Sequence, residues 1–173
     1  MKFHIHSDKT LSVATNCPEE TYELGRRLGA LAFPGLLVLL NGTLGVGKTK
    51  FTQGFGAALG YSRVKSPSFI IMSEYDGPLP MLHADLYRLE RSSEADTLGI
   101  EEYLEDGFTA LVEWAERWRE PEAEEMIIID IQKMPGFDEK REIILKAEGK
   151  KSKAALRLLS ESKAGAEMGE CGC

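Results

Sequence analysis

The sequence is poor in cysteine and has no long apolar segment. Its 3 cysteines are an odd number, and they do not form a disulfide framework. No apolar run approaches the length needed to span a membrane, and residues 1–7 lack the apolar core of a signal peptide. We therefore expect a protein of the reducing cytoplasm, with no membrane partner.

Basic residues are also in short supply. The chain has 21 lysines and arginines against 28 acidic residues, which gives a formal net charge of −7. A broad surface for nucleic acid requires the opposite balance, because phosphates are neutralised by clustered Lys and Arg. This composition argues against tight, autonomous binding of RNA and leaves room only for local basic clusters.

One glycine-rich segment matches the phosphate-binding loop pattern G-x-x-x-x-G-K-S/T. It consists of Gly42, Thr43, Leu44, Gly45, Val46, Gly47, Lys48 and Thr49, called here the phosphate loop. The apolar run 36–40 before it indicates a buried strand, and Phe51 and Phe55 after it have helical spacing. In this order, main-chain N–H groups and a helix N-terminus face a phosphate. The segment predicts a nucleoside triphosphate site, with Lys48 on the β- and γ-phosphates and Thr49 on Mg²⁺.

The remaining apolar runs alternate with helical segments and predict an α/β fold. A helix is expected from Pro18, and the expected strands are 3–6, 70–72, 81–85, 109–113, 126–131 and 142–145. Pro135 and Gly136 lie between the last two strands and favour a hairpin. We expect a three-layer sandwich like that of P-loop NTPases, with a mostly parallel central sheet and a C-terminal hairpin.

The length of 173 residues is typical of one domain. We assign residues 1–148 to a P-loop ATPase domain. From about residue 149 the composition shifts to Lys, Ala, Ser and Glu, and the chain ends with Cys171 and Cys173. This composition is more typical of a flexible tail than of a packed element, although residues 154–159 could form a short helix.

Two acidic residues each follow an apolar run. Asp85 ends the run 81–85, and Glu113 ends the run 109–113. In an open α/β sheet, ligands lie beyond the carboxyl ends of the strands, so both acids are expected beside Lys48 and Thr49. One carboxylate can hold Mg²⁺, and the other can orient or deprotonate the attacking water. Lys48, Asp85 and Glu113 are therefore the predicted catalytic residues, and Thr49, Glu113 and Asp85 the predicted metal ligands.

Other polar side chains have competing interpretations. Ser66 and Ser68 flank Pro67 and could either sense a γ-phosphate or form a plain turn. His83 lies inside an apolar run, which favours a core histidine over a ligand. Trp114 would point to the opposite face from Glu113 if the strand continued, which favours a core or rim position.

Several segments occur together in an order that resembles the bacterial TsaE family of ATPases. They are 42–49, 65–69, 83–89 with the sequence H-A-D-L-Y-R-L, 98–103, and 111–114 with the sequence L-V-E-W. The phosphate loop is generic, but the H-x-D-L-Y-R-L and V-E-W segments are specific to this family. The resemblance spans about residues 15–145, which is most of the chain.

The resemblance implies an ATPase that uses ATP and Mg²⁺ and supports N6-threonylcarbamoyladenosine modification of tRNA. In that family the ATPase works with the TsaB–TsaD transferase pair, supports its repeated turnover, and touches tRNA only indirectly. The resemblance also implies a nucleotide contact for Trp114 and for Ser68, which replaces the usual Thr. Thr43 stands where family members usually have an acid.

Other function classes use the same loop. A small-molecule kinase would pass the phosphate to a metabolite, but the arginines present do not form a recognisable lid pattern. A GTPase would require a guanine-reading N-K-x-D motif, which the sequence lacks. A module that binds nucleotide only to dock a partner is a further alternative.

Overall fold

The computed structural model describes residues 1–65 and 71–161. Eight strands form one sheet with the order β1-β2-β8-β7-β3-β6-β5-β4. The strands are β1 (Lys2–Ser7), β2 (Thr10–Thr15), β3 (Leu36–Asn41), β4 (Met72–Tyr75), β5 (Met81–Asp85), β6 (Thr109–Glu113), β7 (Glu125–Lys133) and β8 (Arg141–Glu148). In the part of the chain that is described, no helix is both long and apolar enough to cross a membrane.

The centre and the edges of the sheet differ in strand direction. The neighbours β7, β3, β6 and β5 are parallel. At one side β8, β2 and β1 pair antiparallel, and at the other β4 pairs antiparallel with β5. The sheet is therefore mixed, and the prediction of a mostly parallel sheet is correct only for its centre. The edges differ because short turns join β1 to β2, β4 to β5 and β7 to β8, and such turns connect antiparallel strands.

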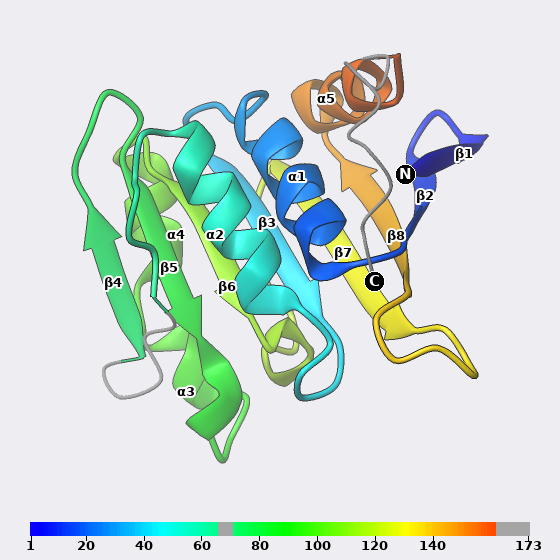
Figure 1. Ribbon diagram of the computed structural model, residues 1–173. Helices are drawn as coiled ribbons and strands as arrows, with labels where there is room; N and C mark the ends of the chain where they lie inside the picture. Colours follow the sequence, from blue (N-terminus) through cyan, green and yellow to red (C-terminus); the bar gives the residue numbers. More distant parts are fainter. Residues whose placement is uncertain (66–70, 162–173) are drawn as a thin grey trace.

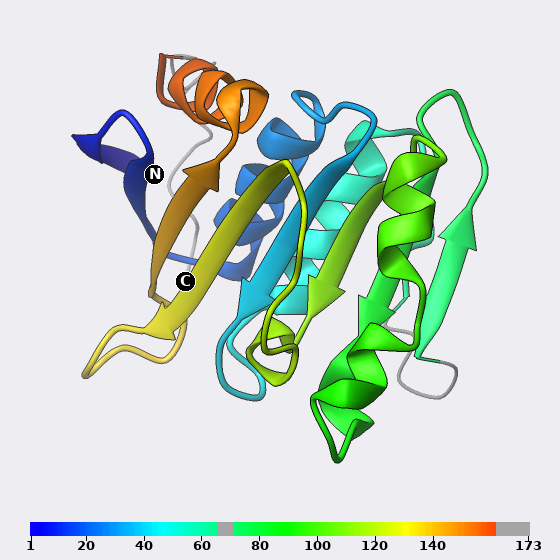
Figure 2. The same cartoon turned by 180° about the vertical axis from the view of Figure 1, so that it is seen from behind.

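Helices lie on both faces of the sheet (Figures 1 and 2). One face carries α1 (Pro18–Gly29), α2 (Lys48–Ala58) and α5 (Lys150–Glu161), and the other carries α3 (Ser93–Asp96) and α4 (Ile100–Glu105). Two single turns, η1 (Leu86–Arg88) and η2 (Ala115–Arg117), follow β5 and β6.

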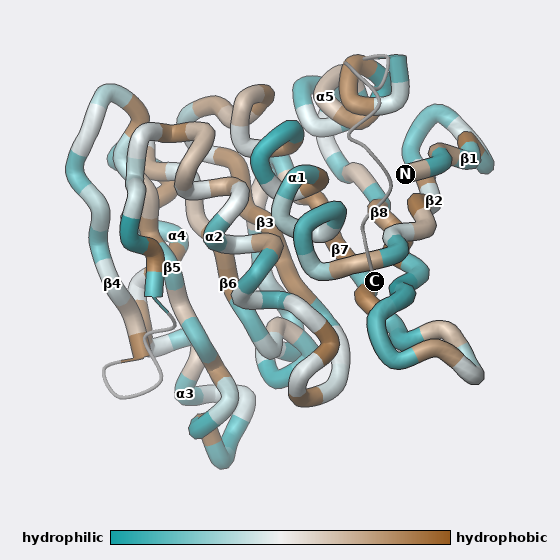
Figure 3. The backbone as a smooth tube through the Cα atoms, in the orientation of Figure 1, coloured by the Kyte–Doolittle hydropathy of each residue, from teal (hydrophilic) through white to brown (hydrophobic). Residues whose placement is uncertain are grey.

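Strand β3 is buried on both faces, which explains its unbroken apolar sequence. Leu36, Val38 and Leu40 pack in the cluster under α1, α2 and α5, while Leu37 and Leu39 pack in the cluster on the α4 side. Figure 3 shows apolar residues along the central strands, beneath helices in which hydrophilic and apolar residues are mixed. The phosphate loop therefore leaves the sheet from a strand that is buried on both faces.

The prediction of a flexible tail from residue 149 is wrong for Lys150–Glu161, because these residues form helix α5. Ala155, Leu156 and Leu159 of this helix are buried, and the last two belong to the cluster shared with α1. The helix is stable because this apolar stripe covers β8 and β2 and not because of its composition. Cys171 and Cys173 lie outside the described residues.

Candidate nucleotide-binding site

The phosphate loop joins the end of β3 to the start of α2. Gly42, Gly45 and Gly47 have φ values of +137°, +72° and +115°, a region that favours glycine. A Cβ on Gly42 would lie 2.5 Å from the carbonyl oxygen of Ile131, so the loop passes close to β7. The loop therefore turns sharply while its main chain leads into the first turn of α2.

Arg141 of β8 holds this loop from behind. The residue is 9% exposed, and its Nε donates a hydrogen bond of 2.8 Å to the carbonyl oxygen of Val46. Nη1 donates to the carbonyl oxygens of Asp138 (2.7 Å) and Lys140 (2.9 Å). Arg141 thus links the loop to the turn between β7 and β8. The sequence gives no signal for this role, because all these partners are main-chain atoms.

Lys48 lies folded against the loop that precedes it. Its Nζ donates hydrogen bonds to the carbonyl oxygens of Gly42 and, at 3.1 Å, Thr43. Burial lowers the pKa of Lys48, and the charges of Glu116, Glu113 and Asp85 oppose this shift. A buried ammonium beside main-chain carbonyls is a strong donor for a phosphate oxygen.

The two predicted acids lie side by side. Asp85 and Glu113 are partners in the register of the parallel strands β5 and β6, at the carboxyl end of both. The Asp85 Oδ1 atom accepts a hydrogen bond of 3.0 Å from the main-chain N–H of Tyr87. The Glu113 Oε2 atom accepts one of 3.0 Å from the hydroxyl of Thr49. The structure thus places both acids at the phosphate loop, where strand ends meet the helix start.

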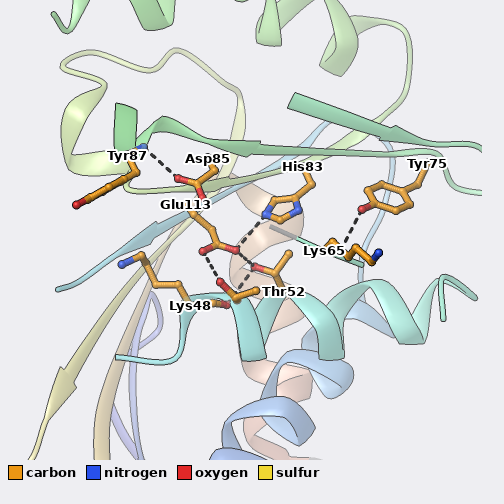
Figure 4. A network of polar contacts seen from close by, with 9 residues as sticks. Lys48, Thr52, Lys65, Tyr75, His83, Asp85, Tyr87 and Glu113 are labelled. Carbon is orange, nitrogen blue, oxygen red and sulfur yellow. Dashed lines mark hydrogen bonds and ion pairs between the residues drawn. The ribbon is translucent and has the colours of Figure 1, made fainter. Parts of the chain in front are cut away.

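Glu113 has two further partners that sequence reasoning missed. The Thr52 hydroxyl and His83 Nε2 each lie 3.0 Å from Glu113 Oε1. Figure 4 shows these side chains converging on the carboxylate from α2 and β5. His83 is completely buried, as expected of a core histidine, but its polar contact is with the candidate catalytic acid. Alternation along β5 could have revealed it, because residues 83 and 85 share one face of the strand.

Trp114 does not continue strand β6. Its φ of +59° turns the chain at the end of the strand, an outlier for a bulky residue. The side chain instead lies beside the phosphate loop, with Lys48 Nζ 3.6 Å from the centre of its ring. The Tyr87 ring packs against it at 4.8 Å, and the Arg117 guanidinium lies 6.0 Å from its ring centre. The strand does not continue, so the condition for a place on the opposite face is not met, and Trp114 lies at the phosphate loop.

These elements line an open pocket of about 540 Å³. Its lining includes Leu44, Gly45, Val46, Gly47, Lys48, Thr49, Asp85, Tyr87, Arg88, Glu113 and Trp114. Gly42 and Thr43 contribute the carbonyl groups that bind Lys48 instead. Ser68 lies outside the described residues.

The donor set suits a phosphate chain and Mg²⁺. Positive-φ glycines and the N-terminus of α2 supply main-chain N–H groups for an anion, and Lys48 supplies the cation. Within residues 1–65 and 71–161, no three His, Cys, Asp or Glu side chains gather as a metal cluster. Mg²⁺ does not need such a cluster, because it binds through one or two carboxylates together with substrate phosphates. Thr49, Glu113 and Asp85 fit that pattern.

Comparison with known proteins gives one consistent family. The model of the family "Threonylcarbamoyl adenosine biosynthesis protein TsaE" matches residues 15–143. The tRNA threonylcarbamoyladenosine biosynthesis protein TsaE of Bacillus subtilis is 43% identical over 143 residues, which are 82% of this chain and 88% of that protein. The protein of the same name from Streptomyces coelicolor is 38% identical over 137 residues, covering 75% and 91% of the two chains.

A solved structure supports the same relationship. The crystal structure of Bacillus subtilis YdiB superposes with a TM-score of 0.74 and 38% sequence identity. The match covers 88% of this chain and 95% of that one. The family model, the sequence relatives and this structure agree, and the chain belongs to the TsaE family.

Proposed function

We propose that this protein is a Mg²⁺-dependent ATPase of P-loop architecture that assists N6-threonylcarbamoyladenosine modification of tRNA. The contact that carries the proposal is the hydrogen bond of 3.0 Å between the Thr49 hydroxyl and Glu113. It brings the last hydroxyl of the phosphate loop to a buried acid on the neighbouring strand. Such a pair is the arrangement that holds Mg²⁺ beside a nucleotide in P-loop NTPases.

The phosphate loop and Lys48 bind the triphosphate in this proposal. The main-chain N–H groups of the loop surround the phosphates, and Lys48 Nζ transfers its hydrogen bonds from loop carbonyls to phosphate oxygens. Thr49, Glu113 and Asp85 would hold Mg²⁺, and the positive charge that it supplies would neutralise the phosphates. Because Lys48 is buried, its charge acts with little screening by water.

Hydrolysis then requires a placed water and an acceptor for its proton. The water oxygen bonds to the γ-phosphorus as the bond to the ADP oxygen breaks, and its proton passes to a carboxylate and on to solvent. Asp85 and Glu113, which are neighbours in the register of β5 and β6, are the carboxylates that we propose for this role. Acid–base assistance of this kind accelerates reactions by about 10²–10⁴-fold.

The proposed role is accessory. The names of the related proteins place them in threonylcarbamoyladenosine biosynthesis. The net charge of −7 disfavours a broad RNA-binding surface, so we propose contact with the TsaB–TsaD transferase complex and only indirect contact with tRNA. ATP turnover would then reset that complex between rounds of modification.

Product analysis tests the chemistry. We expect ATP labelled at the γ-phosphate to give free phosphate and ADP, with Mg²⁺ required. Label transferred to a metabolite would identify a kinase instead. Binding of nucleotide without any phosphate release would indicate a docking module. A pull-down with TsaB and TsaD, with and without ATP and Mg²⁺, tests the partner, and no retention in any condition would refute it.

A further inference from the structure

The two oxygens of the Glu113 carboxylate have different surroundings. Oε1 accepts hydrogen bonds from Thr52 and His83, each at 3.0 Å, on the side of the core. Oε2 has the Thr49 hydroxyl at 3.0 Å, on the side of the phosphate loop. Glu113 is only 2% exposed, so water does not take the place of these partners. The carboxylate thus has one anchored oxygen and one that faces the nucleotide site.

Among residues 1–65 and 71–161, the polar contact of His83 is with Glu113. The imidazole is completely buried in the middle of β5, and its Nε2 binds Glu113. Its other nitrogen, Nδ1, is buried and has no hydrogen-bond partner among the residues that the structure describes. If the side chain only filled space, an apolar residue would give a more stable protein, because burying a nitrogen without a hydrogen-bond partner lowers the free energy of unfolding. The bond to Glu113 is therefore what the imidazole adds to this position.

Thr52 provides the second anchor from the opposite direction. It lies on α2, one helical turn after Thr49, so both hydroxyls face the same carboxylate. The Thr52 hydroxyl lies near both the carbonyl oxygen of Lys48, at 3.1 Å, and Glu113 Oε1, at 3.0 Å. It has a single hydrogen, and the charged carboxylate is the stronger acceptor.

We propose that Thr52 and His83 are positioning residues that orient Glu113 toward Mg²⁺ and the reacting phosphate. The last torsion of a glutamate has a broad, shallow preference, so an unanchored carboxylate rotates easily. Two donors from different elements, α2 and β5, fix Oε1 and leave Oε2 directed at Thr49. The inference rests on the proposed function, because it concerns how the same acid is held for Mg²⁺ binding.

Matched variants separate hydrogen bonding from packing. In His83→Gln the amide nitrogen lies at the same position along the side chain as Nε2, so it can still donate to Glu113. In His83→Asn the amide nitrogen lies at the position of Nδ1, for which the described part of the chain offers no partner. His83→Leu removes both nitrogens. Thr52→Ser keeps the hydroxyl, and Thr52→Val keeps the shape without it.

The main measurement is the gain in affinity for a non-hydrolysable ATP analogue on adding Mg²⁺, determined by calorimetry. We expect His83→Leu, His83→Asn and Thr52→Val to reduce this gain by about 10–100-fold, as loss of partners that orient metal ligands does. His83→Gln and Thr52→Ser should stay within about 3-fold of the natural protein. Affinity without Mg²⁺ should change little in all of them, and kcat for ATP hydrolysis should fall in the same three variants.

Three results would overturn the proposal. The first is a Mg²⁺-dependent gain that is unchanged in His83→Leu and Thr52→Val. The second is equal behaviour of His83→Asn and His83→Gln. The third is a loss that follows the melting temperature across the variants regardless of which donors they keep. If His83→Leu does not fold, the Thr52 pair decides alone. Absence of phosphate release from the natural protein would refute the ATPase proposal, while the Mg²⁺-dependent gain would still test the positioning roles.

Discussion

The ammonium of Lys48 lies on the face of Trp114, with 3.6 Å between Nζ and the centre of the ring. The contact joins the phosphate loop to the end of β6, one residue after Glu113. The same Nζ binds the carbonyl oxygens of Gly42 and Thr43. A phosphate that binds Lys48 must compete with these contacts, so the environment of Trp114 should report on binding.

We predict that ATP with Mg²⁺ changes the fluorescence of this protein and that Trp114→Phe removes the change. A cation held on an indole ring perturbs its emission, and phosphate oxygens would draw that cation away. The other tryptophan, Trp118, is buried and donates a hydrogen bond of 3.0 Å to Asp96, so it supplies a constant background. Calorimetry should show that Trp114→Phe still binds nucleotide. Unchanged emission in the natural protein at saturating nucleotide would contradict the prediction.

Lys48→Ala should weaken ATP binding by about 100-fold or more. The variant loses charge-assisted hydrogen bonds to phosphate, and each tenfold loss corresponds to about 1.4 kcal/mol. Lys2→Ala is the matched control, because it removes the same charge from an exposed position on β1. Calorimetry measures both affinities, and circular dichroism checks the fold. If Lys48→Ala still bound ATP with micromolar affinity, the main chain of the loop would be sufficient to bind the phosphates without the lysine.

Glu113→Gln should lower ATP turnover with Mg²⁺ far more than it lowers ATP affinity without Mg²⁺. The amide cannot accept a proton from water and binds Mg²⁺ poorly, so we expect kcat to fall by about 10²-fold or more. Glu116→Gln is the control, because it removes an exposed negative charge that also acts on Lys48. Release of phosphate is measured with Mg²⁺, and binding of a non-hydrolysable analogue is measured in parallel without Mg²⁺. Equal losses in both would assign Glu113 a structural role.

The parts of the site that the sequence predicts are those with a local signal. The phosphate loop lies between β3 and α2, as its glycines and flanking apolar residues indicate. Asp85 and Glu113 end apolar runs, and the parallel pairing of β5 with β6 brings them together. In each case the residues that define the feature are close in sequence, so a pattern of a few positions contains the information.

The parts that the sequence does not predict depend on distant contacts. Thr52 and His83 are ordinary residues of a helix and a strand until packing brings them to Glu113. The place of Trp114 depends on a single backbone torsion with positive φ. Helix α5 begins beside Glu125 of strand β7. The carboxylate of Glu125 accepts hydrogen bonds from N–H groups at the N-terminus of the helix. No local window around residues 149–161 contains that side chain.

Glu125 should stabilise the protein by about 1 kcal/mol through its contacts with the start of α5. Its carboxylate accepts hydrogen bonds from the main-chain N–H groups of Lys151 (3.0 Å) and Ser152 (2.7 Å) and from the Ser152 hydroxyl (2.8 Å). Burial alone would raise its pKa, but these bonds outweigh burial and the pKa of Glu125 lies below its ordinary value. The ionised carboxylate therefore favours the folded state. Glu125→Gln should lower the free energy of unfolding at neutral pH.

The dependence on pH follows from the sign of that shift. A carboxylate whose pKa is lowered by folding stabilises the folded protein. This stabilisation is fully present at pH values above the pKa in the unfolded chain, about 4.3, and is lost as the pH falls through the pKa in the folded protein. Urea unfolding at pH 7 and at pH 3 should therefore show a difference between natural protein and Glu125→Gln that shrinks in acid. Glu124→Gln, a change at the exposed neighbouring position, should show little difference at either pH. A deficit for Glu125→Gln that is the same at both pH values would mean that packing, and not the charge at the start of α5, is what the substitution removes.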